Sequence, residues 1–301
     1  MGLNNSGMII IGGTDMKNRK CYRENKYYYG DYLEVNLYPV YYHARATKRN
    51  TNRKPSRACQ TRLNQINAER QLARIMAANF TNDDYCMTLT YSPENKPEDM
   101  DRAKKDLRNF FDRLNRARKR AGLEPTKYIY AAEIGERTKR IHFHVVLSGG
   151  LKIKDIQKIW GKGYVDKIKT LMFDETGLRG LARYFCKQQV SSTATAAEAA
   201  HQKRYQCSQN CIKPEPKNND HKYSKRKVKE IASDSDNLRM IEALYPGYYC
   251  AECNSFWNEN NGESYISIML YKQDADLDIR IKPKKDKVKK DENKQLNNST
   301  I

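Results

Sequence analysis

The 301-residue sequence contains no long apolar run. Nowhere do about 18 apolar residues follow one another, which is the length that a membrane-spanning helix needs. The short run Met8-Ile9-Ile10-Ile11 is too brief for the apolar core of a secretory signal peptide. We therefore expect no membrane span, and we interpret the eight scattered cysteines as reduced thiols of a cytoplasmic protein.

The phosphate-binding motif of helicases and other nucleoside triphosphatases is also missing. These enzymes bind the nucleotide phosphates in a glycine-rich loop with the pattern Gly-x-x-x-x-Gly-Lys-Ser/Thr. No such pattern occurs in the chain. The sequence therefore predicts no fused helicase, and any unwinding of DNA would depend on a separate enzyme.

Positive charge dominates the composition. The chain has 56 Lys and Arg against 36 Asp and Glu, a net charge of +20. Such an excess favours a polyanionic partner, with nucleic acid as the first candidate and a membrane surface as the lesser one. Residues 45–74 alone hold nine Lys and Arg and one acidic residue, Glu69. We expect an irregular arm there, then a helix from about Ser56. Phosphate contacts and a solvated basic face both explain this run, and two further basic segments favour phosphate contacts.

Strands and helices are expected to alternate between residues 85 and 168. Expected strands cover Tyr85–Tyr91, Tyr128–Ile134, Ile141–Leu147 and Tyr164–Ile168, and expected helices cover Pro97–Ala121 and Lys154–Trp160. The longer helix has an apolar stripe at helical spacing. Its outer face is dense in cations: Arg113, Arg116, Arg118, Lys119 and Arg120. This order predicts an α+β fold of ferredoxin-like type, with helices packed on an antiparallel sheet.

Histidine is scarce, yet two of the five histidines lie on the expected strand Ile141–Leu147. Because strand side chains alternate, His142 and His144 leave the same face, and Phe143 leaves the other. Two imidazoles at this spacing can hold one metal ion. Glu133, on the preceding strand, can add a carboxylate if the hairpin register places it opposite the histidines.

Each of these residues also has a simpler explanation. A His-x-His pair is more often a surface feature of a half-exposed strand, but the bulky apolar neighbours place this strand in a core. Glu136, in the expected turn, is a rival ligand to Glu133. Glu133 itself has the alternative role of an ion pair with the basic helix.

A further helix is expected to begin near Arg179. In it, Leu181 and Phe185 pack inward, whereas Tyr184 and Lys187 lie three residues apart and share a face. That face can look onto the polar side of the sheet. The simpler interpretation of Tyr184, as of any one of the 21 tyrosines, is an ordinary tyrosine at the edge of the core.

Four later cysteines suggest a zinc site only weakly. Cys250-x-x-Cys253 has the spacing of a zinc finger, but Cys207-x-x-x-Cys211 does not. Nearly 40 residues separate the two pairs. Unpaired thiols are the better interpretation.

Taken in chain order, three of these stretches resemble the motifs of the HUH endonucleases, the rolling-circle replication initiators of small phages and plasmids. Met87-Thr88-Leu89-Thr90 is similar to the first-strand motif. His142-Phe143-His144 is similar to the two-histidine motif, and Tyr184-Phe185-Cys186-Lys187 to the nucleophile motif Tyr-x-x-Lys. The resemblance covers roughly residues 45–190.

The resemblance implies an enzyme that nicks and rejoins single-stranded DNA at a replication origin. Glu133, His142 and His144 would hold Mg²⁺ or Mn²⁺, Tyr184 would be the nucleophile, and Lys187 would assist it. Thr88 and Thr90 would support the site. The position four after Tyr184 is Gln188, which implies an enzyme with one nucleophilic tyrosine. A helicase and a polymerase of the bacterial host would be its partners in the cytoplasm.

We expect four segments: an N-terminal extension with a hairpin (1–44), the HUH endonuclease domain (45–190), a C-terminal extension (191–281) and a disordered basic tail (282–301). Within the extensions we expect Pro39 to end the hairpin, a helix over Ile231–Tyr245 and a strand over Glu263–Lys272. Two alternatives to the initiator stay open. One is an HUH relaxase or transposase, and the other is a non-catalytic DNA-binding protein such as a repressor.

Overall fold

The fold was analysed in a computed structural model, which describes residues 19–42, 58–135, 140–187, 204–259 and 261–277. Several sequence-based expectations lie outside these residues. They concern the basic arm before the first helix, the rival ligand Glu136 and the basic tail from residue 282.

Helices and strands alternate through the described part of the chain. The helices are α1 (Ala58–Asn79), α2 (Met100–Arg120), α3 (Ile153–Trp160), α4 (Arg179–Lys187), α6 (Lys225–Ser233) and α7 (Leu238–Leu244). The strands are β1 (Arg19–Tyr29), β2 (Tyr32–Tyr42), β3 (Tyr85–Leu89), β4 (Tyr128–Ile134), β5 (Ile141–Leu147), β6 (Val165–Thr170), β7 (Gln206–Cys207), β8 (Lys217–Asn219), β9 (Tyr248–Asn258) and β10 (Glu263–Lys272). Among these described elements, no helix is both long enough and apolar enough to cross a bilayer.

One antiparallel sheet, the histidine sheet, has the strand order β6-β3-β5-β4-β7. Its first four strands and the helices α2 and α3 follow the chain order β-α-β-β-α-β of a ferredoxin-like unit. Both helices pack on one face, where Phe110 and Trp160 meet Phe143 of β5 in one apolar cluster. The predicted α+β fold, with helices on an antiparallel sheet, is confirmed.

Two of the five cations that were expected on the outer face of α2 bind carbonyl groups of the protein itself. Arg113 donates hydrogen bonds to the carbonyls of Ile159 (2.9 Å) and Trp160 at the end of α3. Arg118 is only 6% exposed and donates to the carbonyls of Glu124 and Gly149. Both guanidinium groups therefore bind backbone carbonyls, at the end of α3 and in loops, and are not free to bind a ligand. Three exposed cations remain on this helix near its C-terminal end: Arg116, Lys119 and Arg120.

The second sheet, the terminal sheet, joins segments from both ends of the described chain in the order β8-β1-β2-β10-β9. The sequence pattern treats these segments as separate extensions, whereas β10 pairs directly with β2, from Leu37 opposite Ile266 to Tyr32 opposite Tyr271. We had expected Pro39 to end the hairpin, but β2 continues past it to Tyr42. Because the pairing with β10 stops at Leu37, Pro39 lies where β2 is locally an edge, and the missing N–H leaves no partner unsatisfied.

Two short helices, rather than the single expected one, cover one face of the terminal sheet. The helix expected over Ile231–Tyr245 is interrupted after Ser233, because Asp234 to Asn237 form a turn in which the Asn237 side chain accepts a hydrogen bond from the Met240 N–H and caps α7. Val228 of α6 and Ile241 of α7 are fully buried against this face.

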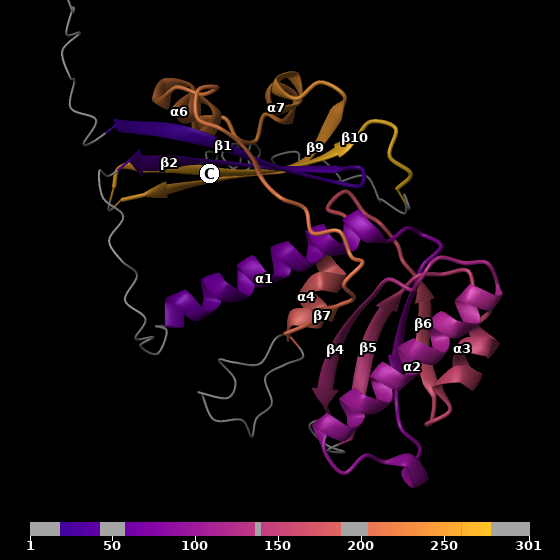
Figure 1. Cartoon of the computed structure of the whole chain (residues 1–301). Coiled ribbons are helices and arrows are strands. Elements are labelled where there is room, and N and C mark those ends of the chain that lie inside the picture. Colours follow the sequence, from indigo (N-terminus) through magenta and orange to yellow (C-terminus); the bar gives the residue numbers. More distant parts are fainter. Residues whose placement is uncertain (1–18, 43–57, 136–139, 188–203, 260, 278–301) are drawn as a thin grey trace, which may run out of the picture.

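Helices α1 and α4 lie between the two sheets, so that helices and sheets alternate in five layers (Figure 1). One buried cluster contains Met76 of α1 and Phe185 of α4 together with Met269 of the terminal sheet and Val146 of the histidine sheet. This shared core holds the terminal sheet against the ferredoxin-like unit.

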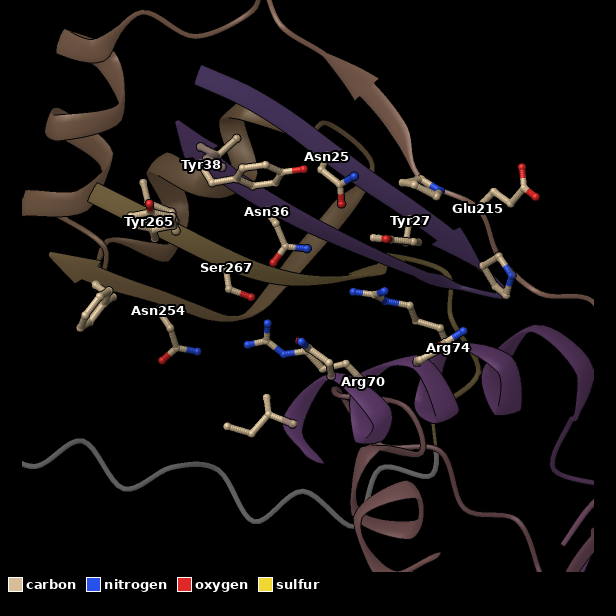
Figure 2. Close-up of a pocket in the computed structure, with 18 of the residues that line it drawn as sticks. Asn25, Tyr27, Asn36, Tyr38, Arg70, Arg74, Glu215, Asn254, Tyr265 and Ser267 are labelled. Atoms are coloured by element: carbon tan, nitrogen blue, oxygen red, sulfur yellow. The ribbon is translucent and has the colours of Figure 1, made fainter. Parts of the chain in front are cut away.

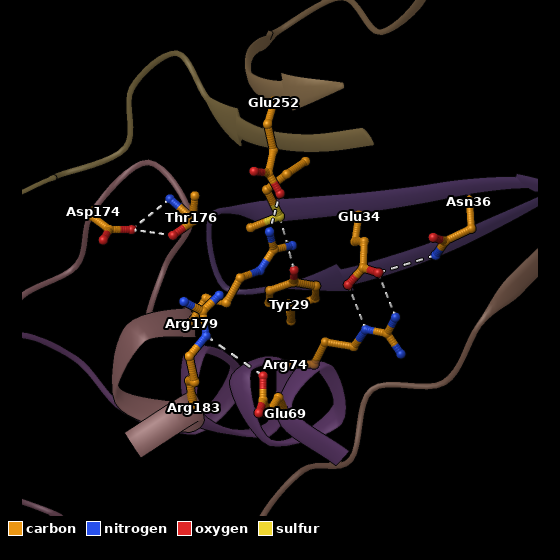
Figure 3. A network of polar contacts seen from close by, with 11 residues as sticks. Tyr29, Glu34, Asn36, Glu69, Arg74, Asp174, Thr176, Arg179, Arg183 and Glu252 are labelled. Carbon is orange, nitrogen blue, oxygen red and sulfur yellow. Dashed lines mark hydrogen bonds and ion pairs between the residues drawn. The ribbon is translucent and has the colours of Figure 1, made fainter. Parts of the chain in front are cut away.

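A buried ion pair ties α1 to the terminal sheet (Figure 3). Arg74 donates two hydrogen bonds to Glu34, at 2.7 and 2.8 Å, and its guanidinium lies 3.5 Å from the centre of the Tyr27 ring. Burial pushes the pKa of Glu34 upward, but the hydrogen bonds and charge of Arg74 outweigh this effect, and the pKa is lowered from 4.5.

We expect Arg74→Met to lower the free energy of unfolding by about 3–5 kcal/mol, because Glu34 keeps a buried charge without its partner. Chemical denaturation measures this loss, and exposed Arg116→Met should change stability by less than about 0.5 kcal/mol. In the unaltered protein the pair stabilises the fold above pH 4.5, the ordinary pKa of the carboxyl. That contribution should be lost as the pH falls below this value, through the lowered folded-state pKa. Equal stability of the two variants would contradict the role of the pair.

Candidate functional site

The β4–β5 hairpin brings three potential metal ligands together. Its register places Glu133 directly opposite His142 and Ala131 opposite His144. Phe143 and Val145 point to the helices α2 and α3, so the two histidines share the other face, which looks toward α4. The alternation of strand side chains therefore puts one carboxylate and two imidazoles on the same patch of sheet.

The three side chains are in direct contact. One Glu133 carboxylate oxygen, Oε2, lies 2.9 Å from Nε2 of His144 and 3.2 Å from Nε2 of His142. Among the described residues, this is the one group of His, Cys, Asp and Glu atoms close enough to hold a metal ion. The site is compatible with a divalent cation, because imidazole nitrogens and a carboxylate oxygen are ordinary ligands of such ions.

Thr88, on the neighbouring strand β3, contacts the other nitrogen of His144. Its Oγ1 lies 3.3 Å from His144 Nδ1, and both residues are buried. Burial lowers the pKa of His144, although its hydrogen bond to Glu133 acts in the opposite direction. Nε2 of His144 is directed at Glu133 and His142. If Nε2 bound an ion, Nδ1 would keep the proton and donate a hydrogen bond to the Thr88 hydroxyl, the kind of outer contact that orients metal-binding histidines.

Replacing Thr88 should therefore weaken metal binding without removing a ligand. We expect Thr88→Val to lower the affinity for Mn²⁺ about 10- to 100-fold, because the His144 ring loses the contact that orients it. Titration with Mn²⁺, followed by electron paramagnetic resonance, measures the affinity. Thr90→Val is the matched control, since the Thr90 hydroxyl contacts Asp166 and the Tyr164 carbonyl instead of a histidine. Equal losses in both variants would contradict a specific role for Thr88.

Tyr184 lies beside the histidines. Its ring centre is 5.1 Å from that of His144 with the planes at 78°, and 40% of the residue is exposed. The buried neighbours Phe185 and Cys186 hold this part of α4 in the core. Tyr184 is thus positioned at the edge of the core with its ring against a candidate metal ligand. Lys187, in the last turn of α4, is exposed.

Polar contacts on both sides fix the position of α4 (Figure 3). Arg179 forms an ion pair with Glu252 of the terminal sheet, and Arg183 lies 3.7 Å from Glu69 of α1. Gly177, at φ +71°, closes the turn that leads into the helix. Helix α4, which carries Tyr184, is therefore held by α1 and by the terminal sheet as well as by its packing on the histidine sheet.

The sequence analysis missed Lys167 of β6. In a regular strand Val165 and Ile168 would lie on opposite faces, but both pack on the apolar cluster below α2. A register shift opposite Met87 indicates a bulge, and Lys167 adopts a left-handed φ of +52°, alone among the described non-glycine residues. The bulge brings the charge of Lys167 near His144, where it contributes to the lowered pKa. Hydrophobic periodicity carries no signal for such a bulge.

The four cysteines considered for zinc do not meet in the described part of the chain. Cys207 and Cys211 pack in the core between the sheets, whereas Cys250 and Cys253 pack below α6 and α7. All four are free thiols.

Comparison with known proteins identifies one family. Residues 84–189 match the family described as replication-associated protein ORF2/G2P. This stretch runs from the start of β3 to the end of α4 and includes the triad, Tyr184 and Lys187, but not the strands of the terminal sheet. No curated protein and no solved structure matches the chain. The family match supports a role in the initiation of replication.

Proposed function

We propose that the chain is an HUH-type endonuclease that initiates rolling-circle replication by nicking and rejoining single-stranded origin DNA. One observation carries the proposal: the ring of Tyr184 lies against His144 of the triad formed with Glu133 and His142. A phenol beside a candidate divalent-cation site suits transfer of a phosphoryl group to tyrosine. The match to replication-associated proteins supports the same function.

In the proposed reaction, the Tyr184 oxygen attacks the phosphorus of one DNA linkage, and the bond between phosphorus and the 3′ oxygen breaks. The 5′ side of the strand remains on Tyr184 as a phosphotyrosine ester. The proton lost by the phenol ends on the released 3′-hydroxyl. Because the ester conserves the free energy of the broken linkage, a 3′-hydroxyl can later attack the ester and reseal the strand. Until then, the released 3′-hydroxyl can prime DNA synthesis.

The triad suits this chemistry as the holder of the ion. Three donor atoms converge within contact distance on one face of the sheet, and the Thr88 hydroxyl contacts the outer nitrogen of His144. A bound divalent ion supplies positive charge to the non-bridging phosphate oxygens. We propose Mg²⁺ or Mn²⁺ on the resemblance to HUH enzymes, although imidazole ligands accept softer ions as well.

Two lysines can assist Tyr184. A free tyrosine titrates near pH 10, so a neighbouring ammonium favours the phenolate. Lys187 follows Tyr184 by almost one helical turn and is exposed at the end of α4. Lys167 brings a second ammonium toward His144 from the bulge in β6. We assign Lys187 to the phenol and Lys167 to the phosphate.

The proposal is tested by trapping the intermediate. Incubation of the protein with single-stranded origin DNA and Mn²⁺ should give a covalent adduct, and mass spectrometry of the digested adduct should place the nucleotide on Tyr184. An adduct on another residue, or none under conditions in which the DNA binds, would leave a basic DNA-binding protein without this activity.

A further inference from the structure

A cleft separates the terminal sheet from the middle of α1, between Ile66 and Ile75, on the sheet face opposite to α6 and α7 (Figure 2). Its volume is about 1120 Å³. Pockets that hold drug-sized molecules measure roughly 300–1,000 Å³, so the cleft suits a longer ligand. The metal triad and Tyr184 do not line it.

The described side chains of α1 become more exposed toward the start of the helix. Leu72, Ile75 and Met76 are buried, whereas Asn67 and other residues toward the helix start are exposed or half-buried. The helix face that looks into the cleft carries side chains spaced by four positions: Ile66, Asn67, Arg70, Gln71, Arg74 and Ile75. Polar and cationic groups therefore face the sheet across the open part of the cleft.

Hydrogen-bonding side chains form a row across the floor of the cleft. The strand register aligns Asn25 with Asn36, Asn36 with Ser267, and Ser267 with Asn254. All four line the cleft (Figure 2). Asn25 and Asn36 donate hydrogen bonds to Asn218 and Glu34. The Asn254 amide and the Ser267 hydroxyl can donate to and accept from base edges, since an amide matches the donor and acceptor pattern of a nucleobase.

Aromatic side chains lie beside this row. Tyr38, Tyr265 and Phe256 line the cleft, and the rings of Phe256 and Tyr265 are 6.4 Å apart. Phe256 is 64% exposed, so part of its ring is accessible to a ligand. Arg70 and Lys213 add positive charge to the lining, against one acidic residue, Glu215.

We propose that this cleft binds a few nucleotides of single-stranded DNA, at a place separate from the tyrosine site. Aromatic faces for stacking, polar groups for base edges and cations for phosphates are the three elements of single-strand recognition. In a duplex the base faces are covered by neighbouring base pairs and cannot reach aromatic rings on the floor of a cleft. The choice of DNA over RNA rests on the proposed function, whereas the choice of a single strand rests on the cleft.

Helix α1 connects the cleft with the proposed nicking site. Arg70 faces the cleft, and the preceding residue, Glu69, contacts Arg183, the neighbour of Tyr184 on α4. The two sites therefore lie on either side of the same helix layer. A strand held in the cleft has its continuation delivered toward α4, so that the cleft anchors DNA while Tyr184 reacts with it.

The test compares Phe256→Ser with Trp257→Ala in the full-length protein. Trp257 is also exposed (49%) and is adjacent on β9, but it faces away from the cleft, with Lys229 of α6 over its ring. Binding of a fluorescein-labelled mixed-sequence oligonucleotide is measured by anisotropy at moderate salt, with EDTA present. We expect binding about tenfold weaker for Phe256→Ser and unchanged for Trp257→Ala, because one base loses its stacking partner.

Arg70→Gln gives a second, independent measurement. It should weaken binding and reduce the slope of log affinity against log salt by about one, as expected when one phosphate contact is lost. Duplex DNA and single-stranded RNA of the same sequence are compared in parallel. Wild-type affinity of Phe256→Ser for single-stranded DNA, or an equal loss for duplex DNA, would overturn the proposal.

Failure of this proposal is distinguishable from failure of the nicking function. Binding in EDTA requires neither the ion nor Tyr184, so the proposal that the cleft binds DNA can be confirmed even if no adduct forms. Conversely, an adduct on Tyr184 together with unchanged binding by Phe256→Ser would support the nuclease function and contradict DNA binding in the cleft. Cross-linking of bromodeoxyuridine-containing DNA should in addition label the peptides of β9 and β10 that hold Phe256 and Tyr265.

Discussion

Tyr184→Phe is expected to abolish the covalent protein–DNA adduct and to reduce nicking at least about 10³-fold, the scale of effects seen when a nucleophile is removed. The substitution deletes only the phenolic oxygen. Its ring can keep the contact with His144, and Tyr184 is 40% exposed, so the substitution changes little buried surface. DNA binding and the free energy of unfolding should therefore stay close to those of the unaltered protein. A labelled oligonucleotide with Mn²⁺, analysed on a denaturing gel, measures both adduct and nicking.

Tyr249→Phe is the matched control for this experiment. Tyr249 is 43% exposed, close to the value for Tyr184, but it lies on β9 of the terminal sheet. The control should form adduct at the normal rate. Adduct formation by Tyr184→Phe would show that another residue is the nucleophile. Loss of activity in both variants would point to general damage and not to the chemistry of Tyr184.

Removal of one metal ligand should have the second largest effect. We expect His142→Ala to lower nicking about 10²- to 10³-fold, because charge stabilisation by a metal ion contributes several kcal/mol to such a transition state. His142 is the better choice for substitution than His144, since its side chain is 20% exposed and that of His144 only 5%. The loss of packing is thus smaller, and the variant should fold.

Metal dependence provides the accompanying measurements. Treatment of the unaltered protein with EDTA should cause the same loss as His142→Ala, and added Mn²⁺ should restore only the unaltered protein. His221→Ala, which removes an exposed histidine outside the site, should behave as wild type. Nicking that persists in EDTA would rule out a catalytic ion and leave the contacts of Glu133 with the two histidines as structural.

The local pattern of the sequence was sufficient to predict the ferredoxin-like unit. The spacing of apolar residues in α2 and the alternation in β5 are repeated over enough residues to determine which face is buried. For the same reason, placing His142 and His144 on one face followed from strand geometry alone. Hydrophobic periodicity was less informative where one irregular residue decides which face of a strand a side chain occupies. Lys167 sits in a bulge, and a one-residue shift reverses every face after it.

Long-range contacts explain the other differences. Arg118 looked like a surface cation because helical spacing does not reveal which loop carbonyls return to the helix end. The pairing of β2 with β10 joins residues more than 200 positions apart, such as Leu37 and Ile266. Each strand by itself indicates only that it needs a partner.

The sequence by itself determined the chemistry that the chain can offer: a carboxylate and two imidazoles on one hairpin, a tyrosine on a later helix and a strong excess of positive charge. These features depend on residue identity and short-range periodicity, which the order of residues contains directly. Only the tertiary structure decided that the two ends of the described chain form one sheet, that α1 stands off from it to leave a cleft, and that Tyr184 meets His144. Those outcomes depend on how the layers pack over a shared core. The packing energy between distant segments depends on both segments together, so no single stretch of the sequence predicts it.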